Sequence, residues 1–170
     1  MRYLLEAAVF LPLFLALDWA SYIEPLGAFN ITPWNPGPAL AILWMTRAGL
    51  GRFPIVLVAT YLADEFVRDV PADLATTLVS AFILTGGYTL IAAALRALLP
   101  SGQILGTVRS LSMFVGVVAV GTTFNAAAFL GFLTTTGLLG RDMLAAGWAR
   151  FWIGDVVGIL VTAPLLLILT

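Results

Sequence analysis

The sequence predicts an all-α membrane protein, a polytopic bundle of about six transmembrane helices. Hydrophobic residues make up 61% of its 170 residues and charged residues only 10%, whereas a soluble domain is about 45–50% apolar and about 25% charged. Apolar runs recur from one end of the chain to the other, and the charged residues fall mostly between them. Because the hydropathy is even, we expect one integral-membrane domain over residues 1–170.

Six apolar segments are expected to form the helices. The second is short for a full span, so it either tilts little or starts from backbone buried below the membrane surface. An amphipathic stretch at 141–148 is expected to lie at the interface. The helical segments are about 3–20, 34–47, 54–70, 72–99, 108–136 and 150–169.

The arginines predict the orientation, since the chain has no lysine. With the N-terminus in the cytoplasm, an even helix count places the C-terminus there too, and five of the eight arginines lie on the inner side: Arg2, Arg47, Arg52, Arg96 and Arg109. Eight of the nine acidic residues, Glu24 among them, would then lie on the outer side; only Glu6 is inner. We therefore expect an N-in/C-in chain with an acidic outer surface.

The chain contains no cysteine and no histidine. That excludes disulfides, thiolate nucleophiles, Cys/His zinc sites and histidine-ligated haem, together with every Ser–His or Cys–His catalytic arrangement. Neither a metal site nor a nucleic-acid partner is expected, and the sequence specifies no cofactor.

Asp155 is the most informative position in the sequence. It is expected about five residues into the last helix, roughly 7–8 Å from its start. An ionised carboxylate at that depth costs several kcal/mol unless it is paired or hydrated, so it should face the bundle interior. Gly154 and Gly158 flank it as a small-xxx-small pair, which lets a neighbouring helix approach closely.

Other polar residues lie at similar depths on other helices. Asp64 and Glu65 precede Arg68 by four and three residues, so either could pair with it on one helical face. Two interpretations stay open: an outer-half cavity that binds a ligand or ion, and a polar lock that fixes helix packing. The candidate ligand-binding or signal-sensing residues are Asn35, Asp64, Glu65, Arg68, Asn125, Arg150, Trp152 and Asp155.

A proteolytic interpretation is rejected. Asp64 and Asp155 are faintly similar to the aspartate pair of intramembrane aspartyl proteases, which have a Tyr-Asp and a Gly-x-Gly-Asp motif. Here Asp64 follows Ala63, and Trp152 stands two positions before Gly154, where that motif has glycine. The chain is not expected to be an enzyme.

Three motifs carry a family resemblance. Residues 34–38 read Trp-Asn-Pro-Gly-Pro, and residues 51–54 read Gly-Arg-Phe-Pro. The third motif is the specific one, and the whole chain resembles the first-described type of bacterial membrane-associated sensor domain. The third motif consists of Trp148, Phe151-Trp152, Gly154-Asp155, Gly158 and Pro164-Leu165.

The resemblance implies an N-terminal signal-input module of the kind joined to histidine kinases and diguanylate cyclases. It would perceive a stimulus in the outer-half cavity and pass it through the last helix to a cytoplasmic output. Any kinase or cyclase activity would lie in an output domain outside these 170 residues. The expected location is the bacterial inner membrane, with both termini cytoplasmic.

The expected partners are the lipid bilayer, a second copy or a larger membrane complex, and a cytoplasmic output domain or partner subunit. The alternative function is that of a non-catalytic accessory, binding or assembly subunit of a larger membrane complex.

Overall fold

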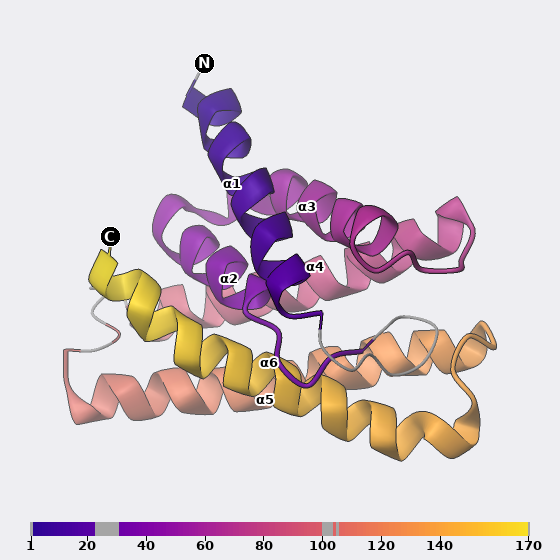
Figure 1. Cartoon of the computed structure of the whole chain (residues 1–170). Helices are drawn as coiled ribbons and strands as arrows, with labels where there is room; N and C mark the ends of the chain where they lie inside the picture. Colours follow the sequence, from indigo (N-terminus) through magenta and orange to yellow (C-terminus); the bar gives the residue numbers. More distant parts are fainter. Residues whose placement is uncertain (1, 23–30, 100–103, 105, 170) are drawn as a thin grey trace.

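The computed structural model describes residues 2–22, 31–99, 104 and 106–169. Glu24 lies outside the described residues. The described part contains six α-helices and two short 3-10 helices (Figure 1), so the all-α class is confirmed. The α-helices are α1 (Arg2–Ala20), α2 (Gly37–Ala48), α3 (Phe53–Phe66), α4 (Leu74–Leu98), α5 (Val108–Thr135) and α6 (Leu144–Leu169), with η1 (Leu50–Arg52) and η2 (Arg141–Met143) between them.

Four described segments are long and apolar enough to cross a membrane: most of α1, all of α4 and α5, and residues 141–168. The helices α2 and α3 have 12 and 14 residues. At 1.5 Å per residue they are about 18 and 21 Å long, whereas the hydrocarbon core is about 30 Å thick. The shortness expected of the second helix is therefore present, and the third helix shares it.

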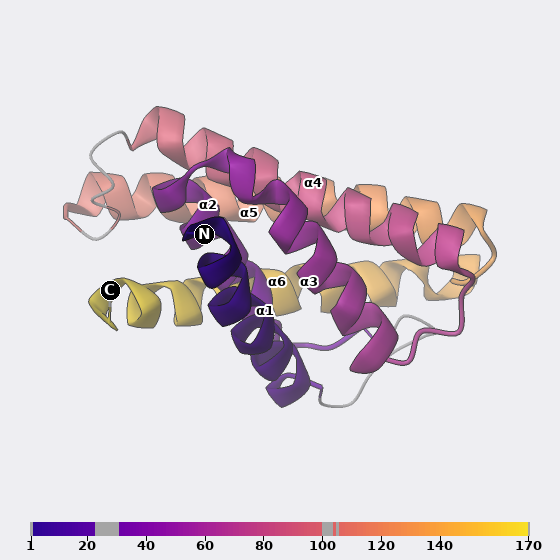
Figure 2. The same cartoon turned by 90° about the horizontal axis from the view of Figure 1, so that it is seen from above.

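The three long helices α4, α5 and α6 form the body of the bundle. The helix α4 lies along α5, α6 packs against α5, α3 packs against α4, and α1 packs against α3 and α2 (Figures 1 and 2). The helix α2 packs against both α4 and α6. Eight of its twelve residues are buried, Ile42 and Met45 completely. Because α2 is surrounded by protein, the non-helical segment 31–36 that leads into α2 need not face lipid.

Two ion pairs lie at opposite ends of α1. Near its start Glu6 accepts from Arg52, with 2.8 Å between the closest atoms. Near its end Asp18 accepts from Arg68, at 2.6 Å. Glu6 and Arg52 were both assigned to the inner side, and Asp18 and Arg68 to the outer side. The structure therefore groups these charges as the sequence predicts, while the side that faces the cytoplasm stays a prediction.

The start of α6 differs from the prediction. The helix begins at Leu144, so the expected interfacial segment 141–148 is η2 followed by the first turn of α6. Trp148 stacks on Trp152 one turn later, with ring centroids 5.7 Å apart, which ties this turn to the rest of the helix. Asp155 is therefore eleven residues beyond the first residue of α6, about 16 Å along the helix. The predicted depth of five residues was wrong.

Candidate functional site

A non-helical segment crosses α6 beside Asp155. The backbone N–H of Asn35 donates to the carbonyl oxygen of Gly154 at 3.0 Å. A Cβ atom on Gly154 would lie 2.5 Å from the carbonyl oxygen of Thr32, and one on Gly158 would overlap the carbonyl of Asn35. The two glycines do permit a close approach, as expected, but the expected partner was wrong: it is the extended segment 31–36 rather than a helix.

The Asp155 carboxylate accepts hydrogen bonds from two other parts of the chain. Nδ2 of Asn35 donates to its Oδ1 at 2.9 Å. The hydroxyl of Tyr88, on α4, donates to its Oδ2 at 3.3 Å. Asp155 is 1% exposed and Tyr88 2%. The expected inward orientation of Asp155 is thus confirmed, and its partners join the segment 31–36, α4 and α6 at one point.

Arg68 pairs with α1 rather than with its own helix. The helix α3 ends at Phe66, so the helical spacing that would bring Arg68 over Asp64 or Glu65 does not extend to it. Its Nη2 and Nε atoms donate to the two carboxylate oxygens of Asp18, at 2.6 and 3.1 Å. The predicted pairing of Arg68 within the third helix was therefore wrong.

Burial and the ion pair act in opposite directions on Arg68. Burial favours the neutral form and would lower the pKa of the guanidinium, but the charge of Asp18 outweighs it and raises the pKa above its usual value. Arg68 is therefore a fixed positive charge at this end of the bundle.

Asp64 lies on the inward face of α3, beside this pair. It is buried, whereas the next residue, Glu65, is exposed. Among the described residues, Oδ2 of Asp64 and Oδ1 of Asn35 have no hydrogen-bond partner. Two buried acceptor oxygens at one site leave room for further donors, either water or a proton.

A small cavity of about 30 Å³ lies between Asp18, Asn35, Asp64, Arg68 and Tyr88 and their apolar neighbours. It is large enough for one or two water molecules. We call the four charged residues at and beside this cavity, together with the two residues that donate to Asp155, the buried polar cluster. Within the described part of the chain, no three acidic, histidine or cysteine side chains form a group that could hold a metal ion. The buried polar cluster consists of Asp18, Asn35, Asp64, Arg68, Tyr88 and Asp155.

The remaining candidates lie elsewhere. Trp152 donates its indole N–H to the carbonyl oxygen of Ala119 at 3.3 Å and so links α6 to α5. Arg150 is half-buried in the second turn of α6 and does not line the cavity. Asn125 is buried between α4 and α5, in a separate groove. The structure thus joins Asn35, Asp64, Arg68 and Asp155, and leaves the other four candidates apart.

Sequence reasoning did not select Tyr88. A tyrosine in an apolar helix was a usable signal, because a buried tyrosine hydroxyl usually finds a hydrogen-bond partner. Asp18 was not among the candidates either. Its role as the partner of Arg68 depends on the packing of α1 against α3, which no local spacing reports.

Comparison with known proteins gives one assignment. No curated protein and no solved structure matches the chain. A family match extends over residues 1–170, the full length of the sequence. That family is a membrane sensory input domain, in agreement with the apolar helices and with the resemblance carried by the motif around Asp155. The chain belongs to the MASE1 family of membrane-associated sensor domains.

Proposed function

We propose that this membrane sensor domain responds to the protonation state of Asp155 in its buried polar cluster and transmits the change through α6 to a cytoplasmic output. The observation that carries the proposal is the hydrogen-bonded junction of Asn35, Tyr88 and Asp155, since it joins a buried carboxylate to the helix that leaves the domain. The signal is a proton rather than an organic ligand because the cavity of about 30 Å³ holds only one or two waters.

The charges of the cluster support a proton-binding role. Three carboxyl groups, those of Asp18, Asp64 and Asp155, face one guanidinium, that of Arg68. The ion pair with Asp18 uses the positive charge, so two carboxyl groups have no cation of their own within the cluster. An uncompensated charge inside the membrane costs several kcal/mol. Taking up a proton removes that cost, and losing it restores the charge.

Transmission through α6 follows from how the helix is held. Asn35 binds α6 twice, through its backbone N–H to Gly154 and through its side chain to Asp155. Protonation of Asp155 weakens the second bond, because a neutral carboxyl group is a poorer acceptor than a carboxylate. Two packings of α6 against the segment 31–36 would then differ little in free energy, and the proton selects between them.

The finer topology belongs to the same proposal. Both termini lie in the cytoplasm of a bacterium, the buried polar cluster lies toward the outer side of the inner membrane, and α2 and α3 complete six passes as short helices. The output then follows α6 directly, and a second copy of the domain brings two outputs together.

The test uses the chain fused after Thr170 to a diguanylate cyclase, with cyclic dinucleotide measured in cells held between about pH 5 and 8. Asp155→Asn should fix the output at one level across this range, because the side chain no longer titrates. Asp73→Asn is the matched control, since Asp73 is an exposed residue before α4. Its output should follow the wild type.

A wild-type pH response in Asp155→Asn would refute the proposal. An output that ignores pH in the wild type, combined with stoichiometric co-purification of another membrane protein from native membranes, would favour the accessory-subunit function instead.

A further inference from the structure

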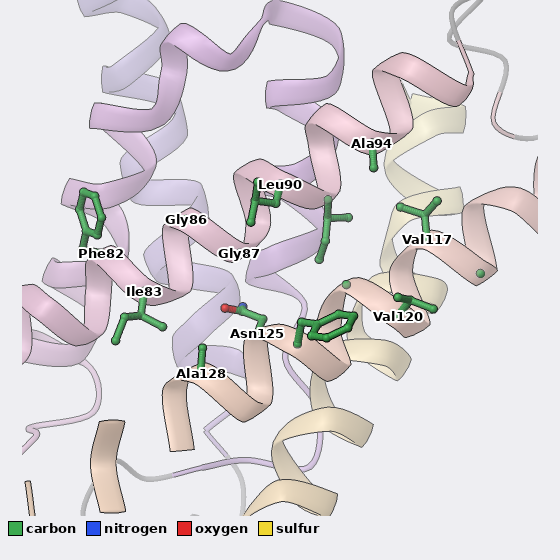
Figure 3. Close-up of a pocket in the computed structure, with 14 residues that line it drawn as sticks. Phe82, Ile83, Gly86, Gly87, Leu90, Ala94, Val117, Val120, Asn125 and Ala128 are labelled. Carbon is green, nitrogen blue, oxygen red and sulfur yellow. The ribbon is translucent and has the colours of Figure 1, made fainter. Parts of the chain in front are cut away.

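A groove runs along the side of the bundle between α4 and α5, away from the buried polar cluster. Its volume is about 880 Å³, and every described residue that lines it is uncharged. Side chains from both helices project into the space between them (Figure 3). Among the described residues of the lining, the only polar side chain is that of Asn125.

Asn125 is buried at the base of this groove, and no described residue completes its side-chain hydrogen bonds. It is 3% exposed, and among the described residues neither its Nδ2 nor its Oδ1 atom has a hydrogen-bond partner. Figure 3 shows its amide directed from α5 toward α4 at Gly87. A buried amide with unmade hydrogen bonds is costly in an apolar surrounding. The amide therefore indicates a ligand that completes it.

The facing helix is shaped to admit this amide. A Cβ atom on Gly87 would overlap the carboxamide of Asn125. A Cβ atom on Gly86 or Gly116 would meet nothing within 4 Å, so both glycines leave the groove open. The groove is thus widened by residues that lack side chains on both helices, and Gly87 leaves room for the carboxamide of Asn125 to lie against α4.

We propose that this groove binds a neutral, lipid-soluble molecule whose polar head carries a hydrogen-bond donor next to an acceptor. The carboxamide of Asn125 offers one acceptor and a donor group, which such a head satisfies together. The protonated carboxyl of a fatty acid and the hydroxyl of an alkyl hydroquinone share this chemistry. The uncharged lining disfavours an ionised head.

The occupant is a slender molecule rather than a helix of another protein. Phe82, Leu90 and Phe124 stand along the groove and are 58%, 72% and 70% exposed. A helix with its side chains is about 10–12 Å across, so it would rest on these side chains above Asn125. A hydrocarbon chain passes between them. The volume lies within the range of about 300–1,000 Å³ typical of small-molecule sites.

The site would supply a second input to the same output helix. Trp152 of α6 donates to the carbonyl oxygen of Ala119, which precedes Val120 of the groove lining. Binding at the groove is nevertheless independent of the proposed proton response, because the groove and the buried polar cluster share no residue.

Photolabelling of the purified chain in phosphatidylcholine nanodiscs tests the proposal. Two probes are used, palmitic acid and a decyl hydroquinone, each with a diazirine on its alkyl chain, at an acidic pH that keeps the carboxyl protonated. At least one probe should label the groove residues. Each probe is then competed with the same molecule lacking the diazirine, and the molecule that displaces its probe at the lower concentration identifies the class of head. Methyl palmitate, which has no donor, should compete about tenfold less well than palmitic acid.

Variants separate the amide from the space around it. Asn125→Leu should lower groove labelling about tenfold. Gly86→Leu should abolish it by filling the groove, whereas Gly131→Leu is the matched control at an equally open glycine of α5 outside the groove. Labelling that is equal in Asn125→Leu and wild type, or absent with both probes, would overturn the proposal and leave the groove to bulk acyl chains.

Discussion

The side chains of Asn35 and Asp155 meet at 2.9 Å although 120 residues separate them in the sequence. Asn35 belongs to the segment that leads into α2, and Asp155 lies in the middle of α6. The backbone N–H of Asn35 also donates to Gly154. Asn35 therefore holds α6 by two hydrogen bonds beside the buried carboxylate of Asp155. Substitutions on either side of this contact should change the stability or the response of the domain.

Gly158→Ala should destabilise the domain. Its Cβ atom would overlap the backbone carbonyl of Asn35, which cannot move without shifting the segment 31–36. We expect a loss of about 1–3 kcal/mol, the usual cost of overpacking. Thermal unfolding in detergent measures it. Gly131→Ala is the control, because its Cβ atom meets nothing within 4 Å and alanine favours a helix by up to about 1 kcal/mol. Equal melting temperatures for Gly158→Ala and the wild type would contradict the proposed close contact between α6 and the segment 31–36.

Arg68→Ala should cost more than Arg52→Ala. Removing Arg68 strands the carboxylate of Asp18, whose side chain is 4% exposed, and breaking a buried pair costs about 3–5 kcal/mol. The pair of Arg52 and Glu6 is more accessible, at 22% and 18%, and accessible pairs contribute about 1 kcal/mol or less. Chemical denaturation of the two variants compares the losses.

A double variant separates the pair from the individual charges. Asp18→Leu combined with Arg68→Leu leaves no buried charge, so it should recover much of the stability that Arg68→Ala loses. A double variant less stable than the single one would show that Asp18 does not depend on Arg68.

The N-terminus of α4 should loosen in acid. Asp73 caps this helix, with its carboxylate accepting from the backbone N–H of Thr76 at 3.0 Å. Hydrogen bonds from Thr76, first from its side chain and then from its backbone, lower the pKa of Asp73 below its ordinary value of 3.8. The stabilisation is therefore complete above the ordinary value and is lost as the pH falls through the lowered one.

Amide exchange at Thr76 measures this effect. Protection should fall below about pH 4 in the wild type. Asp73→Asn keeps a good capping side chain that does not titrate, so its protection should not change over the same range. An acid-dependent loss in that variant as well would assign the loosening to another group.

The sequence alone was enough for the helical class, the inward orientation of Asp155 and the grouping of charges at two ends, because hydropathy and the cost of a charge in lipid act locally along each helix. The bounds of α1, α4 and α5 lie within about two residues of those expected. The start of α6 was missed because an amphipathic turn resembles an interfacial segment until Trp148 is seen to stack on Trp152.

The composition of the site was less accessible. Asn35 and Asp155 were both candidates, but nothing in their spacing indicated that they touch. Arg68 was predicted to pair with Asp64 or Glu65 at helical spacing. Because α3 ends at Phe66, Arg68 lies beyond the helix and pairs with Asp18 instead. Contacts between elements depend on packing angles, which a pattern of residue types does not contain. Asn125 shows the converse, since it was expected in the cluster and lies in another groove.

The most direct test of the central claim, that the charge of Asp155 sets the position of α6, is a distance measurement by pulsed electron spin resonance. The chain has no native cysteine, so two spin labels can be placed cleanly. Leu165→Cys on α6 and Leu98→Cys on α4 are exposed sites, and Leu78→Cys paired with Leu98→Cys within α4 is the rigid control. In nanodiscs between about pH 5 and 8, the α4–α6 distance distribution should shift in the wild type and stay fixed in Asp155→Asn, while the control distance is constant. An α4–α6 distribution that is the same at both pH values, and the same in both proteins, would contradict the claim.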